Sequence, residues 1–575
     1  MTCVRRGLRG QTRRIDDSAA TESTCSAAGE MKMKYLTHCL LSGICIAAIW
    51  TVTPARAEAY SASPANYQNR LKQLKPGDTL NLERGKYPRL HLSNLRGTPD
   101  AWITVTGPPS GPPAVIEGTP NYNTVEIENC SYVSIENLLI DSRGIDGAFG
   151  LSAKGGGNNV THNIRVERNT FIGQNGGQQT DAISTKTPTW GWVIRYNKIS
   201  GAGTGMYLGN SDATQPFVAG VIENNLIEDT IGYNIEIKDQ TEIPAIAGMP
   251  LETSITIIRN NVFIKNDSPS PDGDRPNLLV GAFPETGPGS LNMYEIYGNL
   301  FVHNPREALF QGSGRFSLHD NIFLDGCPRY PAVVLTKQNE PLKVAFLYHN
   351  TVYTSGQGIR FENAALTADA VVGNLVFASS HPIEGPINVL ADNITGSLEM
   401  ASRLVKSPSF DLSTADFYPL PGKCQGTPIE LTSFQSDSDY TLDFNGKSKI
   451  QAKANTVFRG AYAGEGQNSG WKLQAGLKAP SPPAPRLPRL IWIRPSVVQP
   501  GREVQLILTG VNFSDGASVA VSGDGVSLMK TGVDGPTQIR ATLIVAPGAQ
   551  SGTRDVTVTT SMGVSNPLRF QLQPK

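Results

Sequence analysis

Net charge is absent from this chain, since 50 Lys and Arg balance 50 Asp and Glu. The sequence therefore gives no sign of a nucleic-acid partner, because binding to a phosphate backbone depends on clustered positive charge. An apolar run long enough for a membrane is also missing. The run at residues 36–50 is shorter than the roughly 20 residues that a spanning helix needs. Neither nucleic-acid binding nor stable membrane insertion after processing is expected.

Cysteine is scarce beyond the N-terminal region. Four of the seven cysteines precede residue 57, and the other three are Cys130, Cys327 and Cys424. Three cysteines at such wide spacing give neither a disulfide framework nor a metal cluster. A single bridge and three buried thiols both remain open.

The N-terminal region has the pattern of a secretory signal peptide. A basic start at residues 31–34 precedes the apolar run, and Ala55-Arg56-Ala57 offers small residues at the cleavage spacing. This pattern predicts that Met31 is the true start, that residues 1–57 are dispensable and that cleavage occurs near Ala57. The protein is then secreted or periplasmic, with a small acidic excess and a monomeric state expected. An uncleaved anchor with a cytoplasmic tail is the alternative.

Helical periodicity is missing after residue 75, and 58 Gly and 40 Pro indicate many turns. A short amphipathic helix is predicted only at residues 66–74. What recurs instead is an Asn followed by aliphatic or aromatic residues, spaced by 19 to 38 residues, at Asn137, Asn169, Asn197, Asn225, Asn261, Asn299, Asn321, Asn350, Asn374 and Asn393. Fixed strands with variable loops produce such a repeat in a β-solenoid. We expect these Asn side chains to tolerate left-handed corners and to bond from coil to coil, which is a structural role.

The opening of this region resembles a known family. Pro76-Gly77-Asp78-Thr79 precedes a short strand and Gly85, and Gly97-Thr98-Pro99-Asp100 forms a later turn. Over about sixty residues this is similar to the cap and first coils of right-handed parallel β-helix proteins of the chondroitinase B and alginate lyase group. The resemblance implies an all-β fold with a right-handed parallel β-helix, expected over residues 58–475, with 399–475 as its last coils and closing segment.

Five prolines predict an extended linker at residues 476–489, and the sequence pattern changes after it. Residues 490–575 contain short strands about ten residues apart, as in an antiparallel immunoglobulin-like β-sandwich. Pro495–Gly501 and Leu508–Phe513 resemble the opening of IPT/TIG-type domains, which implies a binding or spacing module.

Outward-facing polar residues are predicted on one sheet of the β-helix. Taking Ile183, Met206, Ile235 and Ile359 as inward makes the alternate positions outward: Ser184, Lys186, Tyr207, Glu236, Lys238, Arg360 and Glu362. Two long insertions, residues 239–254 and 265–292, are expected to form walls beside this stripe. Substrate contacts are predicted for Lys186, Tyr207, Glu236, Gln311 and Arg360.

These residue types suit an acidic polysaccharide that contains uronate. Removing the proton beside a uronate carboxylate requires neutralisation of that carboxylate and a nearby base. We assign Lys238 as the base, Arg275 or Arg306 to neutralisation, and Glu236 with Asp239 to orientation or a Ca²⁺ site. The same groups serve β-elimination or C5 epimerisation.

Several alternatives stay open. Chondroitinase B and its relatives carry a Glu-x-Glu pair before the catalytic Lys and a later Arg-His-Gly, whereas this chain has Glu236-Ile237-Lys238 and no Arg-His-Gly. An outward Glu-x-Lys pair is also ordinary on a solvated strand, so a non-catalytic carbohydrate-binding or cell-surface protein is the alternative. A hydrolase of the pectin-degrading type needs clustered aspartates, and Asp181 and Asp212 are scattered. His303, His319 and His349 lie near repeat corners and are expected to be packing or surface residues.

Overall fold

A computed structural model describes residues 57–156, 159–337, 340–450, 455–478 and 487–573. The predictions on the signal peptide, on Met31 and on most of the proline-rich linker therefore lie outside the described residues. Within them the chain is almost entirely β-structure, and no helix is long and apolar enough to cross a membrane. The predicted helix is present as α1 (Tyr67–Leu71).

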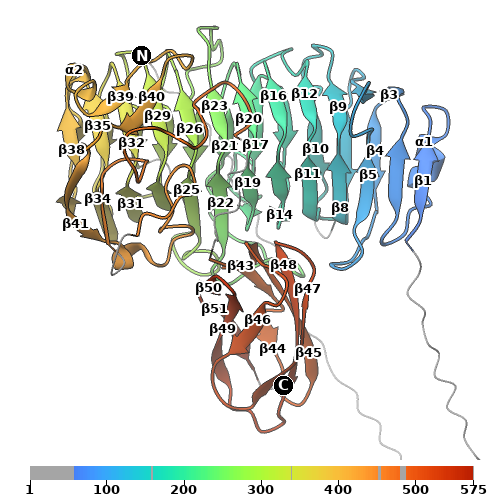
Figure 1. Cartoon of the computed structure of the whole chain (residues 1–575). Coiled ribbons are helices and arrows are strands. Elements are labelled where there is room, and N and C mark those ends of the chain that lie inside the picture. Colours follow the sequence, from blue (N-terminus) through green and yellow to red (C-terminus); the bar gives the residue numbers. More distant parts are fainter. Residues whose placement is uncertain (1–56, 157–158, 338–339, 451–454, 479–486, 574–575) are drawn as a thin grey trace, which may run out of the picture. The chain divides into compact units, whose positions relative to one another are not determined.

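Three long parallel sheets form the first and larger part of the described chain (Figure 1). Sheet A has thirteen strands, in pairing order β1 (Ala59–Ala62), β2 (Thr79–Leu82), β5 (Ile103–Thr106), β8 (Ser131–Glu136), β11 (His162–Glu167), β15 (Val193–Arg195), β19 (Val221–Glu223), β22 (Ile255–Arg259), β25 (Met293–Tyr297), β28 (Arg315–His319), β31 (Val344–Tyr348), β34 (Ala368–Val372) and β37 (Leu390–Ala391).

Sheet B has twelve strands, in pairing order β3 (Gly85–Pro88), β6 (Ala114–Glu117), β9 (Leu138–Asp141), β12 (Thr170–Ile172), β16 (Lys198–Ser200), β20 (Leu226–Glu228), β23 (Val262–Ile264), β26 (Leu300–Val302), β29 (Ile322–Asp325), β32 (Thr351–Thr354), β35 (Leu375–Ala378) and β38 (Ile394–Gly396). Sheet C has eleven strands, from the first coil onward β4 (Leu90–Ser93), β7 (Val125–Glu128), β10 (Leu151–Lys154), β13 (Asp181–Ser184), β17 (Thr204–Leu208), β21 (Ile235–Ile237), β24 (Leu278–Val280), β27 (Phe310–Gly312), β30 (Val333–Leu335), β33 (Ile359–Phe361) and β36 (Ile383–Glu384).

Each coil visits sheets A, B and C in turn, which is the architecture of a parallel β-helix and confirms the predicted fold. The interior is filled by alternate residues of the strands, including Ile183, Met206, Ile235 and Ile359, all at most 1% exposed. This packing follows from strand geometry, since successive side chains point to opposite faces.

The corner between sheets A and B carries the predicted asparagine ladder. From Asn169 to Asn374, each ladder Asn donates through Nδ2 to Oδ1 of the Asn in the next coil, over 2.9 to 3.3 Å, and Asn393 accepts the last of these bonds. The left-handed conformation belongs to the residue before the ladder Asn, as at Arg168 and Asn260. Asn137 itself occupies that left-handed position, and Leu138 donates its backbone N–H to Asn169 in its place. The repeat at Asn137 is therefore shifted by one residue.

Residues 399–475, expected to hold the last coils, contain instead α2 (Leu398–Ala401), the antiparallel pair β39 (Val405–Ser407) and β40 (Asp416–Pro419), η1 (Leu431–Phe434), and the antiparallel pair β41 (Gln425–Glu430) and β42 (Asn455–Phe458). Their aromatic residues, including Phe444 and Trp471, are buried with outward residues of sheet B such as Val262 and Leu300. These residues pack on sheet B because the outer face of that sheet carries aliphatic side chains, and covering them removes apolar surface from water.

The C-terminal part is an antiparallel sandwich with its own apolar core, which confirms the predicted class. One sheet contains β43 (Arg489–Arg494), β45 (Glu503–Val511), β48 (Gln538–Val545) and β47 (Val526–Val533). The other contains β44 (Val497–Val498), β51 (Leu568–Leu572), β49 (Gly552–Thr560), β46 (Ser518–Val521) and β50 (Gly563–Val564). The more specific IPT/TIG assignment stays a prediction.

Candidate functional site

Sheet C brings the predicted outward residues into one row. Strand pairing aligns the row Ser184, Tyr207, Glu236, Leu279, Gln311, Val334 and Arg360. Neighbouring strands lie about 4.8 Å apart, so Gln311 is about 10 Å and Arg360 about 19 Å from Glu236 along the sheet. Arg360 pairs with Glu362 at 2.9 Å and is not part of the group around Glu236.

Glu236 and Lys238 form an ion pair at the centre of this face. Lys238 Nζ lies 2.8 Å from Glu236 Oε1, with the Glu side chain 4% and the Lys side chain 24% exposed. Burial raises the pKa of Glu236 although Lys238 opposes the change. Burial would lower the pKa of Lys238, but the carboxylate of Glu236 outweighs it and raises that pKa overall. Lys238 therefore rests as an ammonium group beside Glu236.

Tyr207 lies between two lysines on the neighbouring coils. Lys186 Nζ is 4.7 Å and Lys238 Nζ 5.7 Å from the centre of the half-buried Tyr207 ring. Burial raises the pKa of the Tyr207 hydroxyl, while Lys238 pulls it down. A phenol beside two ammonium groups can bind an anionic sugar and transfer a proton next to it.

Asp181 is a buried partner of Lys186, with Oδ2 3.3 Å from Lys186 Nζ. Burial raises the pKa of Asp181 to about 7, even though Lys186 lowers it. Asp212 is exposed and accepts hydrogen bonds from Thr214 in its own loop. The two aspartates thus occupy different environments, which gives no support to a paired-carboxylate hydrolase.

Tyr233 and Arg275 extend the group on the side of the loop at residues 265–277. The Arg275 guanidinium lies 5.5 Å from the Tyr233 ring centre, and the Tyr233 hydroxyl bonds to Glu236. Burial raises the pKa of Tyr233, and the charge of Glu236 raises it further. Arg275 also donates to the backbone oxygens of Asp272 and Asp274, which fixes its position.

The loop at residues 265–277 folds back over earlier coils beside sheet C. Gln178 bonds to the backbone of Asp272 and Gly273, and Ser270 donates to the backbone oxygen of Ile231. Arg306 donates to the backbone oxygen of Asp267, 2.6 Å away. Arg306, predicted as catalytic, thus contacts this loop rather than the Glu236 pair.

The predicted walls are only half present. The insertion at residues 265–292 is divided by β24, so it forms two loops, one at each end of this strand of sheet C. Residues 239–254 bury Ile243 and Met249 against Val221 and Ile257 on the outer face of sheet A. That loop covers sheet A because it carries apolar residues to bury there, and of the two predicted walls only residues 265–277 stand beside the site.

The predicted Ca²⁺ ligands do not fit that ion in this arrangement. Glu236 is paired with Lys238, and Asp239 Oδ1 accepts from the backbone N–H of Ala282 at 2.8 Å. Calcium requires six to eight oxygens, whereas an ammonium group stands against one of the two carboxylates.

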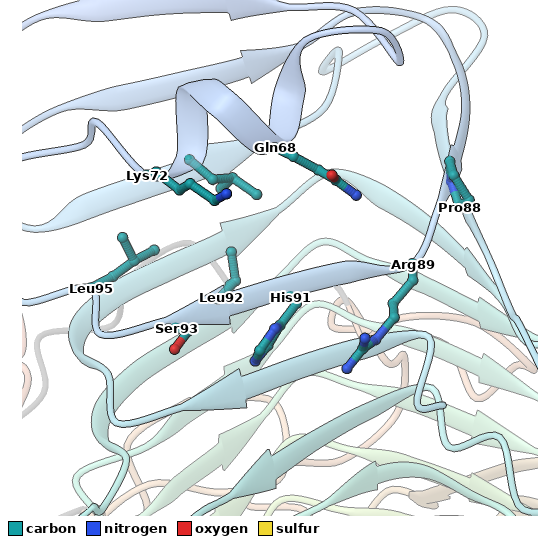
Figure 2. A pocket seen from close by; sticks show the side chains of 9 residues that line it. Gln68, Lys72, Pro88, Arg89, His91, Leu92, Ser93 and Leu95 are labelled. Atoms are coloured by element: carbon teal, nitrogen blue, oxygen red, sulfur yellow. The ribbon is translucent and has the colours of Figure 1, made fainter. Parts of the chain in front are cut away.

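A cavity of about 300 Å³ lies at the start of sheet C, between α1 and β4. Figure 2 shows Arg89 and His91 extending from β4 below Gln68 and Lys72 of the helical segment. Glu126, beside His91, is paired with Arg89 at 2.9 Å and Lys154 at 2.8 Å. This cavity is five strands away from β21 and separate from the Tyr207 group.

Sequence reasoning did not identify Tyr233 as part of the group and assigned Asp181 no role beside Lys186. Tyr233 opens the segment that contains Glu236, but it lies in a corner where the direction of a side chain does not follow strand alternation. Asp181 begins β13, one strand before the Tyr207 strand. A search for titratable residues at strand ends would have found both.

No protein-family model matches the chain, and no curated protein matches it. Among solved structures, the chain is similar to a mutant form of the PL6 family alginate lyase AlyGC, with a TM-score of 0.41 and 11% identity over 77% of this chain and 61% of that one. It is also similar to the A-module of the Azotobacter vinelandii mannuronan C-5 epimerase AlgE4 (TM-score 0.35, 15% identity, 58% of this chain and 89% of that one). The pectate lyase Pel9A gives a TM-score of 0.35 at 11% identity, over 73% and 96% of the two chains. The chain thus spans less than two thirds of AlyGC, and these likenesses concern the fold alone.

Proposed function

We propose that the face of sheet C around Tyr207 binds a uronate-containing polysaccharide and transfers the proton at C5 of the uronate, leading to β-elimination or C5 epimerisation. The observation that supports this most is the placement of Tyr207 between Lys186 and Lys238, with Arg275 on the adjoining loop. Three cations and a phenol on consecutive coils match an anionic chain that needs neutralisation and proton transfer.

In the elimination, Lys186 and Arg275 neutralise the uronate carboxylate, which makes the C5 proton more acidic. Lys238 in its amine form takes that proton, the electron pair forms the C4–C5 double bond, and the C4–O4 bond breaks. The Tyr207 hydroxyl supplies the proton to the departing oxygen. In the epimerisation, Tyr207 instead returns a proton to C5 from the opposite face.

The alternative is a protein that only holds the glycan. It is favoured by the pairing of both lysines with carboxyl groups, Lys238 with Glu236 and Lys186 with Asp181. A base must first release its proton, whereas a binding cation does not.

The test uses the full chain with alginate, pectate, chondroitin and hyaluronan in D₂O. Unsaturated uronate ends report elimination by their ultraviolet absorbance, and deuterium at C5 reports proton exchange by NMR. The Lys238→Ala variant is expected to lose at least a hundredfold in rate. Lys198→Ala, an exposed lysine on sheet B, is the matched control and should retain the rate.

If neither unsaturated ends nor C5 deuterium is detected on any of the four polymers, the catalytic proposal is wrong. In that case affinity electrophoresis in the same polymers tests the alternative. Retardation by one polymer that is lost in Lys186→Ala and kept in Lys198→Ala would support glycan binding without catalysis.

We also propose that the protein is exported and monomeric. The signal-peptide pattern before Ala57 supports export. N-terminal sequencing of the protein recovered from periplasm or medium, and its mass in solution, test both statements.

A further inference from the structure

A cluster of three metal-binding residue types lies at the corner where sheet B passes into sheet C, away from the Tyr207 group. His303 directly follows β26, Asp325 ends β29, and Cys327 comes two residues later. Parallel pairing aligns Val302 with Leu324, so His303 and Asp325 occupy neighbouring coils at the same corner. The cluster is thus built by stacking of coils rather than by a short motif.

We propose that His303, Asp325 and Cys327 form a binding site for a divalent metal ion of the zinc class. His303 Nδ1 is 3.8 Å from Cys327 Sγ and 3.9 Å from Asp325 Oδ1, and all three ligand atoms lie within 4.8 Å of one another. Tetrahedral zinc with ordinary bond lengths places N and S about 3.6 Å apart and N and O about 3.3 Å apart. Contraction by about 0.2 Å on the N–S edge and about 0.6 Å on the N–O edge therefore completes the geometry on these two edges.

The environment of Asp325 independently indicates a cation site. Its side chain is fully buried, and Oδ1 accepts from the backbone N–H groups of Cys327 and Asn304. Oδ2 is enclosed and accepts no N–H or O–H hydrogen bond among the described residues, and the side chain that bonds to this carboxyl group is the Cys327 thiol. A buried carboxylate oxygen in this state is costly, and a metal ion would satisfy it.

A contact at Nε2 orients the His303 ring so that Nδ1 can bind a metal ion. Nε2 lies 2.9 Å from Asp267 Oδ1, which leaves Nδ1 facing the cluster. A carboxylate behind a histidine ligand is a common arrangement at metal sites, where it fixes the ring and its tautomer.

Charge and access also fit a divalent ion. A thiolate, a carboxylate and a neutral imidazole balance two positive charges. By contrast, the acidic group at His91 already has Arg89 and Lys154 against Glu126. The His303 side chain is 29% exposed and Cys327 is partly exposed, so an ion can enter and water can complete the coordination. A bound ion would hold His303 and, through Asp267, the loop at residues 265–277.

Cobalt(II) titration of the reduced, chelator-treated full chain tests the proposal. A near-ultraviolet band from thiolate to metal and strong visible bands are expected at one equivalent, and zinc should remove them. Cys327→Ala should lose the thiolate band, and Asp325→Asn should weaken affinity at least tenfold. Asp267→Asn, which alters only the orienting carboxylate, should weaken it about 10-fold.

Cys424→Ala and Cys130→Ala remove buried thiols elsewhere and are the matched controls. Both should keep the cobalt spectrum, provided that circular dichroism shows each variant folded. The thermal midpoint of the parent chain should rise with zinc, and that of Cys327→Ala should not. A parent chain without the thiolate band, or a Cys327→Ala variant that keeps it, would overturn the proposal whether or not the chain acts on uronates.

Discussion

The carboxyl groups of Asp181 and Glu236 show how burial sets the chemistry of single residues on sheet C. Both are nearly inaccessible, and burial raises the pKa of each in spite of a neighbouring lysine. In turn, Glu236 determines the protonation of Lys238, and Asp181 lies against Lys186. The charge on this face at a given pH therefore depends on these two carboxyl groups.

Glu236→Gln is expected to move the pH–rate profile of the proposed reaction. Glu236 raises the pKa of Lys238, so its removal lets Lys238 lose its proton at lower pH. The rising limb of kcat/KM should shift to lower pH, measured by the ultraviolet assay from pH 6 to 10. An unshifted limb would rule out Lys238 as the base. Glu362 pairs with the distant Arg360, so Glu362→Gln is the control and should leave the limb in place.

Asp181→Asn is expected to change how stability depends on pH. The folded state holds the Asp181 proton up to about pH 7, whereas the unfolded chain releases it near the ordinary value of 3.8. The folded state thus binds more protons in this window, and its free energy of unfolding falls as the pH rises from 4 to 7. Relative to the variant, the parent chain should lose stability across that range.

Urea unfolding at pH 5 and pH 8 measures this difference. Asp515→Asn, an exposed position in the sandwich, provides the comparison. An identical pH dependence in Asp181→Asn and the parent chain would contradict the raised pKa of Asp181.

At the scale of elements, the asparagine ladder holds the coils together at one corner. Asn261 accepts from the backbone and side chain of Asn225 and donates to Asn299 and to the backbone oxygen of Ile222. Asn261 therefore joins three successive coils. Stacked aromatic rings, such as Phe263, Phe301 and Phe323, add a second repeat inside.

Asn261→Ala should destabilise the β-helix by about 3 kcal/mol or more, because it leaves several buried backbone and amide groups without partners. Chemical unfolding followed by circular dichroism measures the loss. Asn81→Ala, on an exposed strand position, should stay within about 0.5 kcal/mol of the parent chain. A small effect at Asn261 would show that the ladder contributes little to stability.

At the scale of the whole molecule, residues 397–450 and 455–478 are tied to the β-helix by buried charge as well as apolar packing. Lys449 Nζ lies 2.7 Å from Asp320 Oδ2, and both side chains are 2% exposed. His319 Nδ1 lies 2.8 Å from the same oxygen. Burial raises the pKa of Asp320 to about 7, against the opposing charge of Lys449.

Lys449→Met should cost about 3–5 kcal/mol at pH 8, since it leaves Asp320 buried without its cation. At pH 5 the loss should be smaller because Asp320 is then protonated. Adding Asp320→Asn should recover most of the stability at pH 8, measured by urea unfolding. Lys406→Met, in the more exposed pair with Asp416, is the control, and equal losses in both single variants would contradict the prediction.

The sequence by itself determined the β-helix, the row of outward residues on sheet C and most of the asparagine ladder. These features repeat, and strand alternation converts position directly into direction, as for Ile235 and Glu236. The sequence did not predict the one-residue shift of the ladder at Asn137, because a single residue in a corner changes which side chain reaches the next coil. The candidate site was predicted as far as Lys186, Tyr207, Glu236, Lys238 and Arg275.

Only the tertiary structure decided what the loops and corners do. It placed residues 239–254 on sheet A and residues 397–450 and 455–478 against the β-helix, and it brought Asp181 and Tyr233 to the lysines of sheet C. It also brought His303 to Asp325 and Cys327, where the sequence showed only a corner histidine and a scattered cysteine. The physical reason is that loop length does not fix loop direction: a loop packs where its apolar residues are buried and its polar groups find partners.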